Sequence, residues 1–254
     1  MPEVSSRTQL AHALQEALGV DRQHAEKIVQ AFDDFVARPL ESNLTKLTGR
    51  DLAKRNPMIY TARGTTTVDD WVDRVLADKE TSAIEAHLGT WMEEVARIVS
   101  GGIKPGSGVD LQRVHPNDPA IVELYAIQSA PNTKNAGGRR SDINALRAAA
   151  AVLRAGKRRV ELNIAVLSGR PKSAPLKADP GIIVLGSDEF WEKVSGVSDF
   201  RVRLIHGTTI LSALVKGRVA DEVARIKAEA VNLFGDADGN LDLDSLANPP
   251  TGSS

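Results

Sequence analysis

The chain has 254 residues, of which 42% are hydrophobic and 26% are charged, and its formal net charge is −1. This is the composition of a globular protein with one large or two small domains, and no apolar stretch approaches the roughly 20 residues of a membrane span. The absence of cysteine excludes disulfides, thiolate nucleophiles and cysteine-held metals. The polar start of the chain does not have the form of a signal sequence, so we expect a cytoplasmic protein with no membrane partner.

Hydrophobic spacing predicts helices in the first part of the chain. Residues 1–37 form a predicted helical hairpin and a separate N-terminal domain, suited to helix packing or dimerisation. The apolar face of its first helix contains Leu10, Leu14 and Leu18, and Gly19 ends that helix. Residues 68–78 begin another predicted helix, and residues 81–99 have the clearest apolar stripe at helical spacing.

The remaining segments alternate between strands and helices. In chain order we expect a strand after the Gly-rich turn at Val109, strands over 121–127, 160–167 and 182–185, and helices over 142–155, from Ser187 and over 211–234. This order predicts an α/β fold with a central mixed sheet flanked by helices. Residues 248–254 are expected to be a disordered tail.

The low net charge hides a strongly basic segment. From Lys134 to Lys177 there are eleven lysine and arginine residues against two acids, a charge of +9, so the rest of the chain sums to −10. Such a segment is either an ordinary solvated face or a surface for a polyanion such as DNA. Charge alone leaves both interpretations open.

Two acidic residues are candidate metal ligands. Asp110 follows the Gly-rich turn, where a carboxylate is costly inside a strand unless a cation binds it. Glu85 lies about 100° from Ile84 on a helical wheel, so it flanks the apolar stripe of residues 81–99. Hard cations such as Mg²⁺ take carboxylate oxygens. The simpler alternatives are an edge-strand aspartate that faces water and a glutamate in a surface salt bridge.

The predicted strand over 121–127 ends in a polar run. Strand alternation places Ala126 and Gln128 on one face and Tyr125 and Ile127 on the other. A glutamine on the inner face at the end of a strand is unusual, and the run continues as Ser-Ala-Pro-Asn-Thr-Lys-Asn.

Together these segments resemble type II restriction endonucleases of the PD-(D/E)xK superfamily, specifically the PmeII-like family. That family typically has Gly-Val/Ile-Asp-Leu and then Ile-Lys-Ser-Gly-Pro-Asn-Trp-Gly-Asn. This chain has Gly-Val-Asp-Leu at Asp110 and Ile-Gln-Ser-Ala-Pro-Asn-Thr-Lys-Asn from Ile127. Further stretches agree in order across roughly residues 35–248: Lys54-Arg55-Asn56-Pro57 with Tyr60, Glu85 with Leu88-Gly89 and Trp91-Met92-Glu93, Phe190-Trp191 with Ser195-Gly196, and Asn232-Leu233-Phe234 before Asp238-Gly239-Asn240-Leu241-Asp242.

The resemblance implies a restriction-endonuclease-like core over residues 38–247. It further implies a homodimer that cuts double-stranded DNA at a specific sequence and uses Mg²⁺ held by Asp110 and Glu85. Gln128 stands at the position of the catalytic lysine, and Lys134 is a candidate for the missing cation. The expected DNA contacts come from the loop and from the basic segment: Ser129, Asn132, Asn135, Arg139, Arg140 and Arg147.

One departure from the family pattern leaves alternatives open. The family lysine is Gln128 here, and Ala126 leaves the usual acidic position empty. Either glutamine suffices because the metal supplies most of the electrostatics, or Lys134 supplies the cation, or the chain is a catalytically decayed DNA-binding protein of the same fold. A nuclease for branched or damaged DNA is a further alternative. Asp142 is a candidate second metal ligand, although capping of the next helix is our preferred interpretation of it.

Overall fold

The computed structural model describes residues 6–106, 108–130, 135–169 and 172–248. Its contacts divide the chain into two compact units. The first unit contains residues 1–32 and 89–211, and the second contains residues 33–88 and 212–254. The predicted boundaries of a 1–37 domain and a 38–247 domain stay predictions.

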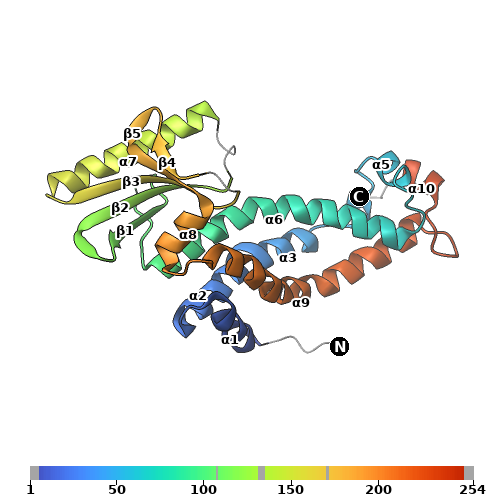
Figure 1. The fold of residues 1–254 in the computed structure, drawn as a ribbon. Coiled ribbons are helices and arrows are strands. Elements are labelled where there is room, and N and C mark those ends of the chain that lie inside the picture. The colour runs from blue at the N-terminus through green and yellow to red at the C-terminus, as the bar shows by residue number, and fades with distance from the viewer. Residues whose placement is uncertain (1–5, 107, 131–134, 170–171, 249–254) are drawn as a thin grey trace. The chain divides into compact units, whose positions relative to one another are not determined.

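The first unit is built around a five-stranded mixed sheet with the order β1-β2-β3-β5-β4 (Figure 1). Its strands are β1 (Leu111–His115), β2 (Asp118–Gln128), β3 (Arg159–Val166), β4 (Ala174–Leu176) and β5 (Asp179–Leu185). β2 pairs antiparallel with β1 and parallel with β3, β3 pairs parallel with β5, and β4 pairs antiparallel with β5. The predicted α/β fold with a central mixed sheet is therefore confirmed.

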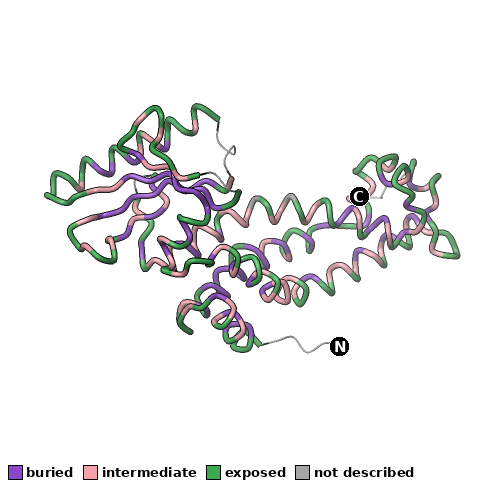
Figure 2. Tube along the Cα trace, in the orientation of Figure 1, coloured by how far each residue is buried: buried purple, intermediate pink, exposed green. Residues whose placement is uncertain are grey.

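Helices α7 (Ala136–Ala155) and α8 (Ser187–Ser195) contact opposite faces of this sheet. Strand alternation assigns the faces, because successive side chains of a strand point to opposite sides. On β2, Leu124 packs in one apolar cluster with Leu146 of α7, whereas the ring of Tyr125 lies 5.7 Å from the ring of Phe190 in α8. Figure 2 shows that buried residues follow the strands between the two helices.

A group of charged side chains is buried on the α8 face. The side chain of Glu123 in β2 is fully buried, and it binds Arg113 of β1 and Lys193 of α8, the latter with Nζ 2.8 Å from Oε1. The hydroxyl of Tyr125 donates to Oε2 of Glu123 at 2.9 Å. Burial raises the pKa of Glu123, but hydrogen bonds from Lys193 and Arg113 outweigh it, so the pKa lies below the ordinary value of 4.5.

The predicted N-terminal helices are present as α1 (Arg7–Leu18) and α2 (Arg22–Phe32). Ser6 forms a capping box with Gln9, and Gly19 ends α1 in the left-handed conformation at φ 68°. In the first unit, α1 packs closely on the start of α9 (Phe200–Phe234): a Cβ atom added at Gly207 would lie 2.9 Å from Leu14.

Several predicted boundaries differ from the structure. The two helices expected over 68–78 and 81–99 are one helix, α6 (Val68–Ser100), because no proline or glycine interrupts the chain between their apolar patterns. Helix α7 begins at Ala136, six residues before the predicted start, because Asn135 caps it. The short strand β4 was not predicted, because its three residues show no hydrophobic alternation.

The second unit is helical. Besides parts of α6 and α9, it contains η1 (Asp33–Ala37, a π-helix), α3 (Arg38–Thr45), α4 (Gly49–Leu52), α5 (Pro57–Thr61) and α10 (Leu243–Ala247). Trp71 and Phe234 meet edge to face in its core, with ring centroids 5.4 Å apart. The fully buried Asp33 accepts two hydrogen bonds from Arg218, at 2.6 and 2.9 Å.

Across the described part of the chain, no helix has the length and apolar character needed to cross a membrane.

The buried charges on the α8 face predict acid-sensitive stability. Because the pKa of Glu123 is lower in the folded chain than in the unfolded chain, its ionised form stabilises the fold above about pH 4.5, and this stabilisation is lost as the pH falls through the folded pKa. Glu123→Gln should therefore lower the free energy of unfolding at neutral pH, by about 3 kcal/mol for a broken buried pair. Urea titrations at several pH values should show that the difference in free energy of unfolding between the variant and the unaltered chain becomes smaller in acid. A difference that stays constant with pH would contradict this.

Candidate active site

The candidate active site lies at the C-terminal end of β2. Gln128 is the last residue of this strand, is 5% exposed, and points to the α7 face as its position in the alternation predicts. Its Nε2 atom donates a hydrogen bond to Oδ2 of Asp142 in α7, at 3.2 Å. A carboxylate only accepts hydrogen bonds, so this contact sets the orientation of the amide, and Oε1 is the end of Gln128 that can accept one.

Asp110 is attached to the same strand end from the side of β1. Its backbone N–H donates to the carbonyl oxygen of Tyr125 at 3.0 Å, and its Oδ2 atom accepts from the N–H of Ile127 at 2.7 Å. Gly108 makes the preceding turn at φ 76°, a conformation that favours glycine. These contacts hold the half-buried carboxylate of Asp110 in one place beside the central strand.

The last residues of β2 therefore bind two acidic side chains from distant parts of the sequence. Asp110 binds the backbone of Ile127, and Asp142 binds the side chain of Gln128. Ala126 shares the inward face of Gln128, is 1% exposed, and adds no acid. The strand end thus combines two carboxylates with a neutral amide.

A small cavity lies beside Gln128. Its volume is about 180 Å³, and its polar lining comes from Gln128 and Arg139. Its apolar walls come from α7 and the strands: Ile143, Ile164, Val166, Leu176 and Val184. A polar group that enters this cavity can meet the amide of Gln128 and the guanidinium of Arg139, and the guanidinium is a good donor to phosphate oxygens.

The donor chemistry of this strand end suits a hard cation. Within the described residues, no group of three or more histidine and acidic side chains is gathered as a preformed metal cage. Mg²⁺ does not need such a cage, because it is usually held by one or two carboxylates together with substrate phosphates and water. Asp110 and Asp142 are carboxylates of this kind.

Asp142 is not a helix cap, so our preferred interpretation of it is wrong. Helix α7 starts at Ala136, and its cap is Asn135, whose Oδ1 accepts from the N–H of Gly138 at 2.9 Å. Asp142 lies further along the helix and is 8% exposed. Its spacing shows why it is buried: Leu146 and Ala149, four and seven residues later, belong to the buried face of α7. The same spacing in the sequence would have predicted this burial.

The other predicted site residues have varied surroundings. Ser129 and Arg140 are exposed near the strand end and the start of α7. Arg147 lies further along α7, where its guanidinium forms an ion pair with Asp179 at 2.8 Å. Glu85 is exposed on α6 in the second unit. Asn132 and Lys134 lie outside the described residues, so all the predicted roles in metal, DNA and catalytic contacts stay predictions.

Comparison with known proteins gives one family match. A family model described as type II restriction endonuclease EcoO109I matches residues 23–211, which are 189 of the 254 residues. The matched segment includes β1 to β5 with α7 and α8. A search of curated proteins found no match. The resemblance to type II restriction endonucleases is confirmed, and the narrower PmeII-like family stays a prediction.

The hydrogen bond between Gln128 and Asp142 should contribute to the stability of the fold. Asp142→Ala leaves the buried Nε2 of Gln128 without this acceptor, which should lower the free energy of unfolding by about 1–3 kcal/mol. Asp142→Asn keeps an oxygen acceptor at the same place and should cost less. Chemical denaturation of both variants tests this, and equal losses would mean that the hydrogen bond contributes nothing.

Proposed function

Since the chain belongs to the family of type II restriction endonuclease EcoO109I, we propose that it is a sequence-specific endonuclease that hydrolyses phosphodiester bonds of double-stranded DNA with Mg²⁺. The observation that supports this most directly is the position of Asp110. Its carboxylate is fixed by the N–H of Ile127 at the end of the strand that also ends in Gln128. A type II nuclease needs an acid in a fixed place beside its scissile phosphate.

In this proposal Asp110 is the principal metal ligand and Asp142, in the same unit, is the second acid, whereas the metal contact of Glu85 stays a prediction. A bound divalent cation lowers the pKa of a water molecule and neutralises charge on the scissile phosphate. Gln128, held by Asp142, accepts a hydrogen bond from the attacking water through Oε1 and so orients it. Arg139, on the wall of the neighbouring cavity, donates to a phosphate oxygen of the bound strand.

The neutral amide changes the electrostatics of the site. A lysine at position 128 would add one positive charge beside Asp142, whereas Gln128 leaves the strand end one unit more negative. A more negative site favours a divalent cation and gives no direct stabilisation of negative charge that develops on the phosphate. The proposed enzyme therefore depends more heavily on its metal than one with lysine in this position.

A second candidate function follows from the same residues. Gln128 and Ala126 together replace the lysine and the acid of the family pattern, which favours a DNA-binding protein that has lost its cleavage activity. This alternative keeps the DNA partner and the basic start of α7 but predicts no hydrolysis with any divalent metal.

We also propose that the protein acts in the cytoplasm as a homodimer. Restriction sites are commonly palindromic, and two-fold symmetry of a protein dimer matches the two-fold symmetry of such a site. We propose that DNA contacts in each protomer come from Ser129, Asn132, Asn135, Arg139, Arg140 and Arg147, and that Lys134 is a candidate for the missing catalytic cation.

Asp110→Asn tests the proposed metal ligand. The asparagine keeps an oxygen that can accept from the N–H of Ile127, so the fold should be retained, but it removes the charge that binds the cation. Plasmid cleavage with Mg²⁺ should slow by at least about 100-fold, which is the scale for losing one electrostatic element of a site. Cleavage at an undiminished rate would exclude Asp110 from the active site.

Substitutions at Gln128 separate the enzyme from the decayed binding protein. If Gln128 orients the water, Gln128→Ala should slow cleavage by about 10- to 100-fold, the lower range for loss of a positioned proton acceptor. Gln128→Lys should keep cleavage, because Asp142 can pair with the new ammonium. An unaltered chain that shifts DNA in a gel but cuts nothing with Mg²⁺ or Mn²⁺ would favour the binding protein.

A further inference from the structure

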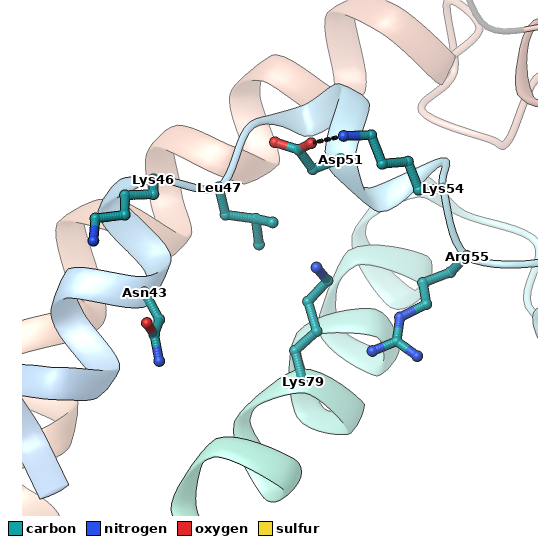
Figure 3. Close-up of a pocket in the computed structure, with 7 residues that line it drawn as sticks. All are labelled: Asn43, Lys46, Leu47, Asp51, Lys54, Arg55 and Lys79. Atoms are coloured by element: carbon teal, nitrogen blue, oxygen red, sulfur yellow. Dashed lines mark hydrogen bonds and ion pairs between the residues drawn. The ribbon is translucent and has the colours of Figure 1, made fainter.

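The second unit contains a basic pocket that the proposed catalytic chemistry does not use. Its volume is about 640 Å³, and it opens between the end of α3, the segment after α4 and one face of α6 (Figure 3). Its lining is Asn43, Lys46, Leu47, Asp51, Lys54, Arg55 and Lys79. Four of these seven residues are cationic, and Asp51 is the one acid among them.

The acid in this pocket is already paired. Asp51 accepts a hydrogen bond from Nζ of Lys54 at 2.6 Å and also binds Thr48 in a capping box. These hydrogen bonds hold the pKa of Asp51 far below its ordinary value. Lys54 and Asp51 therefore neutralise each other, and the net positive charge of the lining comes from Lys46, Arg55 and Lys79.

The three remaining cations come from separate segments, and no ion pair to any of them is found among the described residues. Lys46 is the residue after α3, Arg55 precedes α5, and Lys79 lies on α6. In Figure 3, Lys79 extends from its helix into the space below the Asp51–Lys54 pair. Burial, followed by repulsion from Arg55, lowers the pKa of Lys79. An anion placed among these groups would relieve that repulsion.

The backbone around the pocket is held by contacts with α9. Arg225 donates to the carbonyl oxygen of Leu47 at 2.9 Å, and Glu229 accepts from the N–H of Gly49 at 2.9 Å. A Cβ atom added at Gly49 would lie 3.0 Å from the backbone nitrogen of Ala230, so this segment packs tightly on α9. The cations therefore extend from a fixed frame, which reduces the entropy lost when they bind a ligand.

We propose that this pocket binds a phosphate group of the DNA backbone, through Lys46, Arg55 and Lys79. The inference rests on the proposed function, which supplies DNA as the partner. Arginine and lysine are the usual side chains for phosphate, and arginine matches its oxygens with two parallel donors. The lining contains no aromatic ring on which a base could stack, so the pocket suits the backbone rather than a base.

The test is DNA binding measured over a range of salt concentrations. A labelled duplex of arbitrary sequence is titrated without divalent metal, so that nothing is cut, and binding is followed by fluorescence anisotropy. Each phosphate contact contributes about 0.9 to the slope of log affinity against log salt. The double variant Arg55→Gln/Lys79→Gln should reduce this slope by about 1 to 2 and weaken binding at least roughly 10-fold at low salt. Its melting temperature should stay unchanged.

Lys216→Gln is the matched control. Lys216 is an exposed lysine on the α9 segment of the second unit and does not line the pocket. This variant removes one charge from the same unit, so it should leave the slope and the affinity as they are in the unaltered chain. If each removed charge costs as much affinity and slope in the control as in the double variant, only the overall charge matters, which would overturn the inference.

Three further outcomes would also overturn it. If the unaltered chain binds and cuts DNA while the double variant keeps the full slope, the pocket does not contact DNA, and the proposed function stands. If inorganic phosphate raises the melting temperature of the unaltered chain but not of the double variant, with an unchanged slope for DNA, the pocket takes a small phosphate instead. A chain that neither binds nor cuts DNA fails at the proposed function itself, and the inference falls with it.

Discussion

The register of β2 between its two neighbours is the constraint on which the candidate active site depends. The antiparallel pairing with β1 brings Asp110 to the C-terminal end of β2, where the N–H of Ile127 binds its carboxylate. The parallel pairing with β3 requires a crossover, and α7 provides it, which brings Asp142 to Gln128. A slip of one residue would turn Gln128 to the α8 face and separate it from Asp142. Ligands of α/β proteins commonly bind at this carboxyl end of parallel strands.

The two faces of β2 accommodate charged groups in different ways. On the α8 face, Glu123 is fully buried and compensated by Arg113 and Lys193, so its charge serves the stability of the fold. On the α7 face, Gln128 is neutral and meets a carboxylate with an amide N–H. A neutral donor satisfies Asp142 without a second buried charge and its desolvation cost. Glutamine also lacks the positive charge that a nuclease with lysine at this position would use. The residue that avoids a second buried charge at position 128 is therefore not the one that would stabilise negative charge on a phosphate.

The sequence predicted the features that depend on local pattern. It did not predict those that depend on contacts between residues far apart in the chain. The alternation around Tyr125 and Gln128 gave the correct faces of β2, and Gly19 correctly ended α1. The start of α7 was misplaced because Gly137 and Gly138 are weak helix formers, and the cap at Asn135 outweighs them. By contrast, Lys79 lies far in sequence from Lys46 and Arg55, and neither charge nor periodicity indicates that one pocket gathers them.

The strand end and the basic pocket have opposite charges, so they act on a phosphodiester chain in opposite ways. The strand end presents the carboxylates of Asp110 and Asp142, which repel a phosphate unless a cation lies between them. The pocket presents Lys46, Arg55 and Lys79, which attract a phosphate directly and need no metal. Under the two proposals, affinity for DNA and the chemistry on it belong to different residues, as is usual where backbone contacts fix the position of the duplex. The two proposals together imply binding without metal and cleavage only with metal, because removing the cation would disable the carboxylate site and leave the lysines and the arginine unchanged.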